Sequence, residues 1–161
     1  MCRPTAWPLN RLYSGRTASG LPNGVPRTIV GTGTVDGLDY IDIRYNGTPT
    51  GTGANTIVFE PAVTVAIGEI WSLSIFVALV GGALTNVSGF TLRAGGEGGT
   101  NYTPNATLTR WTDTQVRSAT AGALTLRWNW TALAAVDVTF RFAAPQRTLG
   151  AQMLPPIRTS A

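Results

Sequence analysis

Two alternating stretches near the C-terminus decide the fold. Leu124-Thr125-Leu126-Arg127-Trp128-Asn129-Trp130 has an apolar side chain at every even position and a polar one at every odd position. Residues 136–142 (VDVTFRF) repeat the pattern. Successive side chains of a β-strand point to opposite faces of the sheet, so this period of two predicts two strands with one core face and one solvent face each.

Similar segments recur along the chain from Leu38 onward, separated by turn residues such as Asn46-Gly47 and Gly81-Gly82. No stretch has apolar residues at convincing helical spacing. Their number and spacing predict an all-β fold, an antiparallel β-sandwich of jelly-roll type. The predicted strands are residues 38–45, 56–60, 70–80, 88–94, 107–111, 115–118, 123–130 and 136–143.

The composition removes several kinds of chemistry. The 161 residues include 12 cationic side chains, all of them arginine, against 8 acidic ones, with no histidine and a single cysteine, Cys2. Without histidine there is no imidazole base, no histidine-activated nucleophile and no histidine metal ligand. One cysteine forms neither an intrachain disulfide nor a cysteine zinc site. We therefore expect a protein that is not an enzyme and has no cofactor.

The positive charge is concentrated at the N-terminus. Residues 1–30 carry four arginines and no acid, whereas residues 31–161 carry eight arginines and eight acids. Residues 1–33 are also rich in proline and glycine, so we predict an N-terminal docking arm followed by a jelly-roll domain with an extended tail at 34–161. A poorly ordered terminus is the alternative. The candidate docking residues are Arg3, Trp7, Arg11, Tyr13, Arg16 and Arg27.

The distribution of charge also indicates which kind of molecule the N-terminal arm binds. Arginine pairs bidentately with carboxylates on protein surfaces, and a neutral body offers few contacts to phosphates. We therefore favour other proteins as partners of the arm over direct binding to nucleic acid. The longest apolar stretch, residues 70–84, contains two serines and is shorter than a membrane-spanning helix. We expect no membrane insertion, and no secretory signal is recognisable.

Four aromatic residues fall outside the predicted core faces, namely Tyr40, Phe76, Tyr102 and Trp111. An exposed ring can pack on the apolar face of a sugar while polar groups beside it bind the hydroxyls. Surface aromatic residues without a ligand are the alternative. The candidate glycan-binding residues are Trp111 with Arg110 and Asp113, Tyr40 with Asp42 and Arg44, and Tyr102 in a loop.

Three acidic residues, Asp36, Asp39 and Asp42, lie in one short run. With backbone carbonyls they could form a structural calcium site. The alternative is that Asp36 and Asp39 are turn residues, and no other metal site is expected.

The C-terminal residues resemble a known family. The run 138–151 (VTFRFAAPQRTLGA), followed by Leu154-Pro155-Pro156-Ile157-Arg158-Thr159, resembles the last strand, turn and tail of carbohydrate-binding-like jelly-roll modules in bacteriophage head-fibre (head-spike) and tail-fibre proteins. Residues 40–50 resemble the first strand of these modules, and residues 68–87 their central strand and hairpin. One departure is Arg147-Thr148, where the family usually has Leu-Glu. We expect Pro145 to end the last strand and Gly150 to reverse the chain.

The resemblance implies a non-enzymatic structural protein of the virion, a head-fibre or capsid-decoration protein attached to other virion proteins by its N-terminal arm. A tail-fibre receptor-binding module that binds host surface polysaccharide is the alternative. The resemblance also implies a homo-oligomer, with the trimer as the form typical of fibre modules. On this interpretation the protein is made in the host cytoplasm and displayed on the virion surface.

Overall fold

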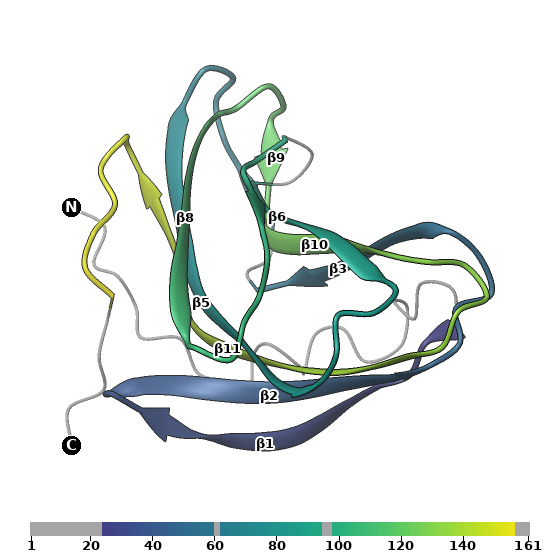
Figure 1. Ribbon diagram of the computed structural model, residues 1–161. Coiled ribbons are helices and arrows are strands. Elements are labelled where there is room, and N and C mark those ends of the chain that lie inside the picture. Colours follow the sequence, from purple (N-terminus) through teal and green to yellow (C-terminus); the bar gives the residue numbers. More distant parts are fainter. Residues whose placement is uncertain (1–23, 60–61, 95–97, 157–161) are drawn as a thin grey trace.

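Two antiparallel sheets pack face to face in the computed structural model of the protein (Figure 1). The structure describes residues 24–59, 62–94 and 98–156. The five-stranded sheet contains, in spatial order, β1 (Arg27–Val35), β2 (Leu38–Gly47), β11 (Val136–Leu149), β5 (Ile70–Gly82) and β8 (Thr109–Val116). The four-stranded sheet contains β3 (Gly53–Val58), β10 (Leu124–Trp130), β6 (Val87–Ala94) and β7 (Asn101–Tyr102). A two-stranded ribbon is formed by β4 (Val63–Thr64) and β9 (Ala121–Gly122).

The chain alternates between the two sheets. After the β1–β2 hairpin it crosses to β3, returns to β5, crosses to β6 and β7, returns to β8, crosses to β10 and ends in β11. As a result β11 lies between β2 and β5, and β10 lies between β3 and β6. This is the connectivity of a jelly roll, with β1 added at one edge. The predicted all-β antiparallel sandwich is confirmed.

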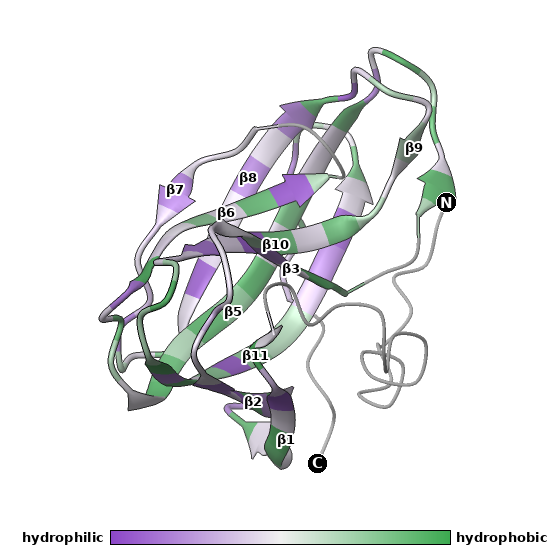
Figure 2. Ribbon diagram, turned by 90° about the vertical axis from the view of Figure 1, so that its right-hand side faces the viewer, coloured by the Kyte–Doolittle hydropathy of each residue, from purple (hydrophilic) through white to green (hydrophobic). Residues whose placement is uncertain are grey.

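The core lies where the apolar faces of the two sheets meet. Leu124, Leu126 and Trp128 of β10 are fully buried, as the alternation predicted. The ring of Trp128 lies 5.7 Å from that of Phe140 in the opposite sheet and stacks on Phe90 at 5.6 Å, centroid to centroid. Figure 2 shows hydrophobic and hydrophilic residues alternating along strands of the sandwich.

The first strand of the fold was not predicted. β1 pairs with β2 in an antiparallel hairpin, and its turn residues Asp36 and Gly37 have φ angles of 51° and 70°. Positive φ at both positions is typical of a type I′ turn, in which Asp-Gly is favoured. The first described strand of the sandwich therefore begins at Arg27, which corrects the predicted boundary at residue 33.

The chain's own C-terminal segment covers part of the outer face of β5. Ser72 and Ser74 lie on the face of this strand that is turned away from the core, and both are fully buried. The Ser72 hydroxyl donates a hydrogen bond to the carbonyl of Gly150 (2.7 Å), and Nη2 of Arg110 donates to the carbonyl of Leu154 (2.6 Å). Backbone carbonyls of the segment thus replace water as partners of these side chains.

β11 continues beyond the proline that was predicted to end it. The strand runs to Leu149, and its register to β5 shifts between Ala143 and Gln146. Pro145 lies in this bulge, where proline is tolerated because the regular ladder of hydrogen bonds is interrupted. Gly150 then has a φ of 106°, and the predicted reversal at this glycine is confirmed.

Candidate functional site

Alternate side chains of β2 form a polar strip on the outer face of the five-stranded sheet, the face turned away from the core. The register of β11 against β2 adds two charged side chains to the strip, Asp137 opposite Asn46 and Arg141 opposite Asp42. The structure therefore brings together the three residues of this predicted glycan site, Tyr40, Asp42 and Arg44. We call this set the outer strip, and its members are Tyr40, Asp42, Arg44, Asn46, Asp137 and Arg141.

Two bidentate ion pairs join the strands of the outer strip. Nε and Nη2 of Arg44 donate to the two carboxylate oxygens of Asp137, at 2.8 and 2.7 Å. The same atoms of Arg141 donate to the carboxylate of Asp42, at 2.8 Å each. The first pair is about half exposed, with 47% and 50% of the two side chains accessible, whereas the second is 24% and 13% accessible. The Arg141–Asp42 pair is therefore the less screened of the two.

The ion pairs shift the ionisation of their members. Hydrogen bonds from Arg44 and then from Asn46 lower the pKa of Asp137 from 3.8 to about 2. The hydrogen bond to Asp137 raises the pKa of Arg44, and the hydrogen bond to Asp42 raises the pKa of Arg141. The charges of the Arg44–Asp137 pair are accordingly fixed throughout the neutral range.

The aromatic part of the outer strip is partly covered by protein. The guanidinium carbon of Arg141 lies 3.7 Å from the ring centroid of Tyr40, and the Tyr40 hydroxyl would lie 2.8 Å from a Cβ atom at Gly33. Ala143 of β11 pairs with Tyr40 on one side and with Phe76 on the other. Two half-buried aromatic residues thus lie in one row across three strands.

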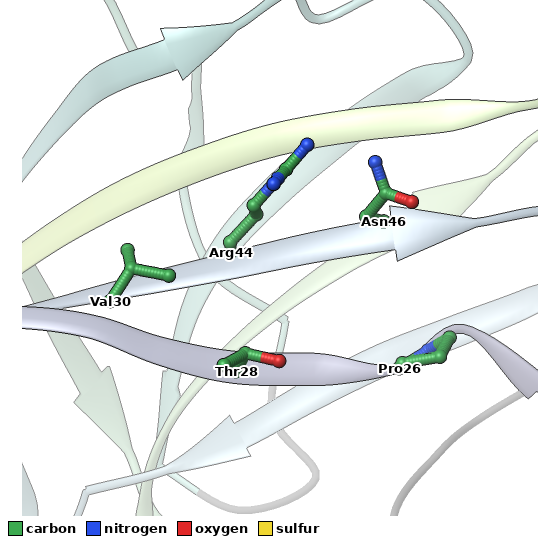
Figure 3. Close-up of a pocket in the computed structure, with 5 residues that line it drawn as sticks. All are labelled: Pro26, Thr28, Val30, Arg44 and Asn46. Atoms are coloured by element: carbon green, nitrogen blue, oxygen red, sulfur yellow. The ribbon is translucent and has the colours of Figure 1, made fainter.

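A hollow opens at the other end of the outer strip (Figure 3). It has a volume of about 320 Å³ and is lined by five residues from β1, β2 and the residue before β1. Arg44 and Asn46 contribute polar groups to it, while the apolar part comes from β1 and its start. The residues that line the hollow are Pro26, Thr28, Val30, Arg44 and Asn46.

The second predicted glycan site is not formed. Trp111, expected to be exposed, is only 3% accessible; its ring stacks on Tyr102 with 4.8 Å between centroids and 6° between planes. Arg110 points to the opposite face of β8, where its Nη2 donates to Ser74 Oγ and Gln146 Oε1, and burial lowers its pKa. The prediction was wrong because Trp111 lies on the inner face of β8, where Phe90 of β6 and Tyr102 of β7 pack against it.

Tyr102 and Asp113 instead close the edge of the sandwich. The Tyr102 hydroxyl donates to the carbonyl of Thr112 and accepts from its backbone N–H. The carboxylate of Asp113 accepts from the backbone N–H of Thr100 at 3.2 Å and from Nε2 of Gln115 at 2.7 Å. These two predicted binding residues therefore make contacts within the fold.

Asp137, Arg141 and Asn46 were not among the predicted site residues. The alternation of residues 136–142 had placed Asp137 and Arg141 on a solvent face. Only the pairing of β11 with β2 brings them beside Arg44 and Asp42, which are distant in sequence.

The remaining candidates are those for docking and for calcium binding, and some of them lie within the described residues. Arg27 is in β1, opposite Tyr45. Of the calcium candidates, Asp36 is in the β1–β2 turn, Asp39 accepts a hydrogen bond from Thr34 Oγ1 (3.0 Å) and Asp42 pairs with Arg141. The predicted docking residues Arg3, Trp7, Arg11, Tyr13 and Arg16 lie outside the described residues.

Two features are absent from residues 24–59, 62–94 and 98–156. No group of three or more His, Cys, Asp or Glu side chains there could hold a metal ion. No helix in the same ranges is long and apolar enough to cross a membrane.

Comparison with known proteins adds one structural similarity. No family model and no curated protein matches the sequence. A solved structure described as "CBM4 structure and function" is similar to this chain with a TM-score of 0.41 and 15% sequence identity, over 80% of this chain and 80% of that chain.

Proposed function

We propose that this chain is a non-enzymatic structural protein of a bacteriophage virion, a head-fibre or capsid-decoration protein that displays the jelly roll. In this proposal the N-terminal segment attaches to other virion proteins. The resemblance of residues 138–159 to the closing motif of phage fibre modules supports this assignment, and so does the distribution of charge.

The observation that carries the proposal is that several arginines of the sandwich serve its own structure. Arg44 and Arg141 form ion pairs across β2 and β11. Arg147 stacks on Trp71, 4.3 Å from the ring centroid, and donates to the carbonyl of Gly122 at 3.1 Å. By contrast, residues 1–23 contain three arginines and no acid. Guanidinium groups of this segment suit bidentate pairing with an acidic patch on a partner protein.

The position of the C-terminal segment favours the N-terminus as the point of attachment. Hydrogen bonds from Ser72 and Arg110 hold residues 150–154 against the outer face of β5. Thr148 Oγ1 adds a longer contact to the carbonyl of Gln152, at 3.4 Å. The last part of the described chain is thus engaged within the sandwich, which leaves the basic N-terminal segment as the better docking element.

Particle binding tests the proposal. Full-length protein and a variant that lacks residues 2–23 are mixed with particles of the parent phage that lack this protein, and bound protein is measured after sedimentation. We expect the truncated variant to lose binding while its circular dichroism and melting temperature stay unchanged, because it keeps every described strand and the buried Val25. Undiminished binding by the truncated variant would contradict the proposal.

A matched pair of variants separates charge from geometry. In one, Arg3, Arg11 and Arg16 become glutamine, and in the other the same three residues become lysine. Lysine keeps the charge but not the planar fork of donors. We expect the glutamine variant to lose most particle binding and the lysine variant to retain an intermediate level.

The row of Tyr40 and Phe76 favours a second candidate function, binding of host surface polysaccharide by a tail-fibre receptor module. Two aromatic rings flank Ala143 on one face, with Arg141 and Asp42 beside Tyr40. A glycan array with host polysaccharides tests this candidate, using wild-type protein, Tyr40→Ala and Phe76→Ala. Leu133→Ala is the control, because Leu133 is 77% exposed in a loop away from the row. Absence of binding by the wild-type protein would exclude this function for the polysaccharides tested.

A further inference from the structure

The outer edge of β1 has no partner strand within the described ranges, because β1 is the terminal strand of its sheet. The phase of its hydrogen bonds follows from the bond between Asn46 N–H and the carbonyl of Pro26 (3.3 Å). In an antiparallel ladder, residues alternately point their backbone groups toward and away from the neighbouring strand. The register of β1 against β2 shifts by one residue between Ile29 and Gly31. With this shift included, the backbone N–H and C=O groups of Ile29, Thr32 and Thr34 point away from β2.

Most of the sequence of β1 lacks the usual protection of an edge strand. Residues 28–35 (TIVGTGTV) contain no charged residue and no proline, and six of the eight are β-branched. Val30 is 53% exposed. Natural edge strands are commonly short or carry lysine, proline or inward-pointing charges, which discourage pairing with another chain. Among the described residues, β1 has two such devices, Arg27 at its start and a bulge near Val30.

We propose that β1 is a docking edge that pairs in antiparallel fashion with β1 of a second copy of this chain. Residues 28–35 of the two copies carry no charge, so they meet there without like-charge repulsion. The ends of the strand carry opposite charges, Arg27 at the start and Asp36 directly after the end. Antiparallel pairing brings Arg27 of each copy toward the Asp36 end of the other, so the pairing is electrostatically complementary.

Such a pair has two-fold symmetry, since the same strand is used by both copies. The two five-stranded sheets become one continuous sheet, and the outward groups of Thr32 and Thr34 gain backbone partners. This inference goes beyond the proposed function, because it requires only the edge of the sandwich and no virion component.

The purified full-length chain tests the inference. Sedimentation velocity and native mass spectrometry give its mass, and amide hydrogen exchange of Thr32 and Thr34 is followed over a wide range of protein concentration. We expect a dimer whose formation slows exchange at these two amides. A monomer at every concentration would overturn the inference. Slow exchange that does not depend on concentration would also overturn it, by showing that the edge is covered within one chain.

Variants place the contact on β1. Thr32→Lys puts a positive charge on each copy at the pairing edge and should weaken dimerisation by more than ~10-fold. Thr32→Pro removes an outward N–H without removing a hydrogen bond to β2, and should do the same. Thr103→Lys is the matched control, since Thr103 is exposed and follows β7 on the opposite side of the sandwich. A dimer that persists in both Thr32 variants would overturn the inference.

Discussion

The two edges of the five-stranded sheet are built differently. At the β8 edge, the Tyr102 hydroxyl forms hydrogen bonds with the backbone N–H and carbonyl of Thr112. The side-chain amide of Gln115 connects β8 to β6 by hydrogen bonds to Ala94 N–H and to the carbonyl of Leu92, at 2.9 Å each. At the β1 edge, the residues alternate between half-buried and exposed positions, and those after Arg27 carry no charge. One edge is thus closed by side chains of the facing sheet, while the other presents backbone groups and small β-branched residues.

The difference shows that closure of a sheet edge depends on what the facing sheet can reach. β7 and β6 lie beside β8 and supply a phenol and backbone groups, so β8 has partners within the sandwich. β1 extends the five-stranded sheet beyond the jelly-roll strands, and within residues 24–59, 62–94 and 98–156 it has a neighbour on one side only. If the two edges differ in energy as they do in geometry, substitutions at the β8 edge should cost more stability than substitutions at the β1 edge.

Gln115→Leu should have the largest effect. The side chain of Gln115 is 5% exposed, and its loss leaves the buried N–H of Ala94 and the carbonyl of Leu92 without partners. Unsatisfied buried groups cost about 1–3 kcal/mol each, so we expect the free energy of unfolding to fall by roughly 3 kcal/mol. Urea denaturation measures this free energy.

Thr34→Val is the matched substitution at the β1 edge. It removes only an exposed hydrogen bond to Asp39 and should change the free energy of unfolding by less than about 0.5 kcal/mol.

Gly99→Ala and Gly33→Ala compare a glycine at each edge. A Cβ atom at Gly99 would collide with the carbonyl of Leu92 and the carboxylate of Asp113. Overpacking of this kind typically destabilises by about 1–3 kcal/mol. At Gly33 the Cβ atom meets only the outer end of the Tyr40 ring, which can move. We therefore expect a clear drop in melting temperature for Gly99→Ala and little change for Gly33→Ala; equal drops would contradict the comparison.

Tyr102→Phe should have a smaller effect at the closed edge. The substitution keeps the ring stacked on Trp111 and removes only the hydroxyl that binds Thr112. We expect a loss of about 1 kcal/mol and faster amide exchange at Thr112, with exchange at Thr32 unchanged. If exchange at Thr112 stayed the same, the phenol would not be protecting the β8 edge.

The smallest effect concerns the exposed Arg44–Asp137 pair beside β1. The pKa of Asp137 is lowered from 3.8 to about 2, so its stabilising contribution is present above pH 3.8 and is lost as the pH falls through 2. Arg44→Gln should return the pKa of Asp137 toward 3.8, as measured by an NMR titration of its carboxyl carbon. An unchanged pKa would mean that Arg44 is not the cause of the shift.

The candidate site was only partly accessible to sequence reasoning. Alternation along residues 38–45 placed Tyr40, Asp42 and Arg44 on one face, and the structure confirms that grouping. The same reasoning failed for Trp111, because the parity of a strand does not say which of its faces a second sheet will cover. It also predicted two separate strands, residues 107–111 and 115–118, where the structure has the single strand β8 from Thr109 to Val116. The Asp36-Gly37 turn between two β-rich runs was the signal that would have revealed β1.

The class of fold and much of the core follow from local patterns in the sequence. Period two along residues 124–130 and 136–142 fixed which side chains share a face, since that depends only on local strand geometry. The tertiary structure decided which faces and edges are covered. Ser72 is buried by a segment that begins at Gly150, and Arg44 pairs with Asp137 across 93 positions. Tyr102 closes the β8 edge, whereas no other described strand pairs with the outer side of β1. These contacts join residues far apart in the chain, so their partners are set by the order of strands in the sheets and not by any local pattern.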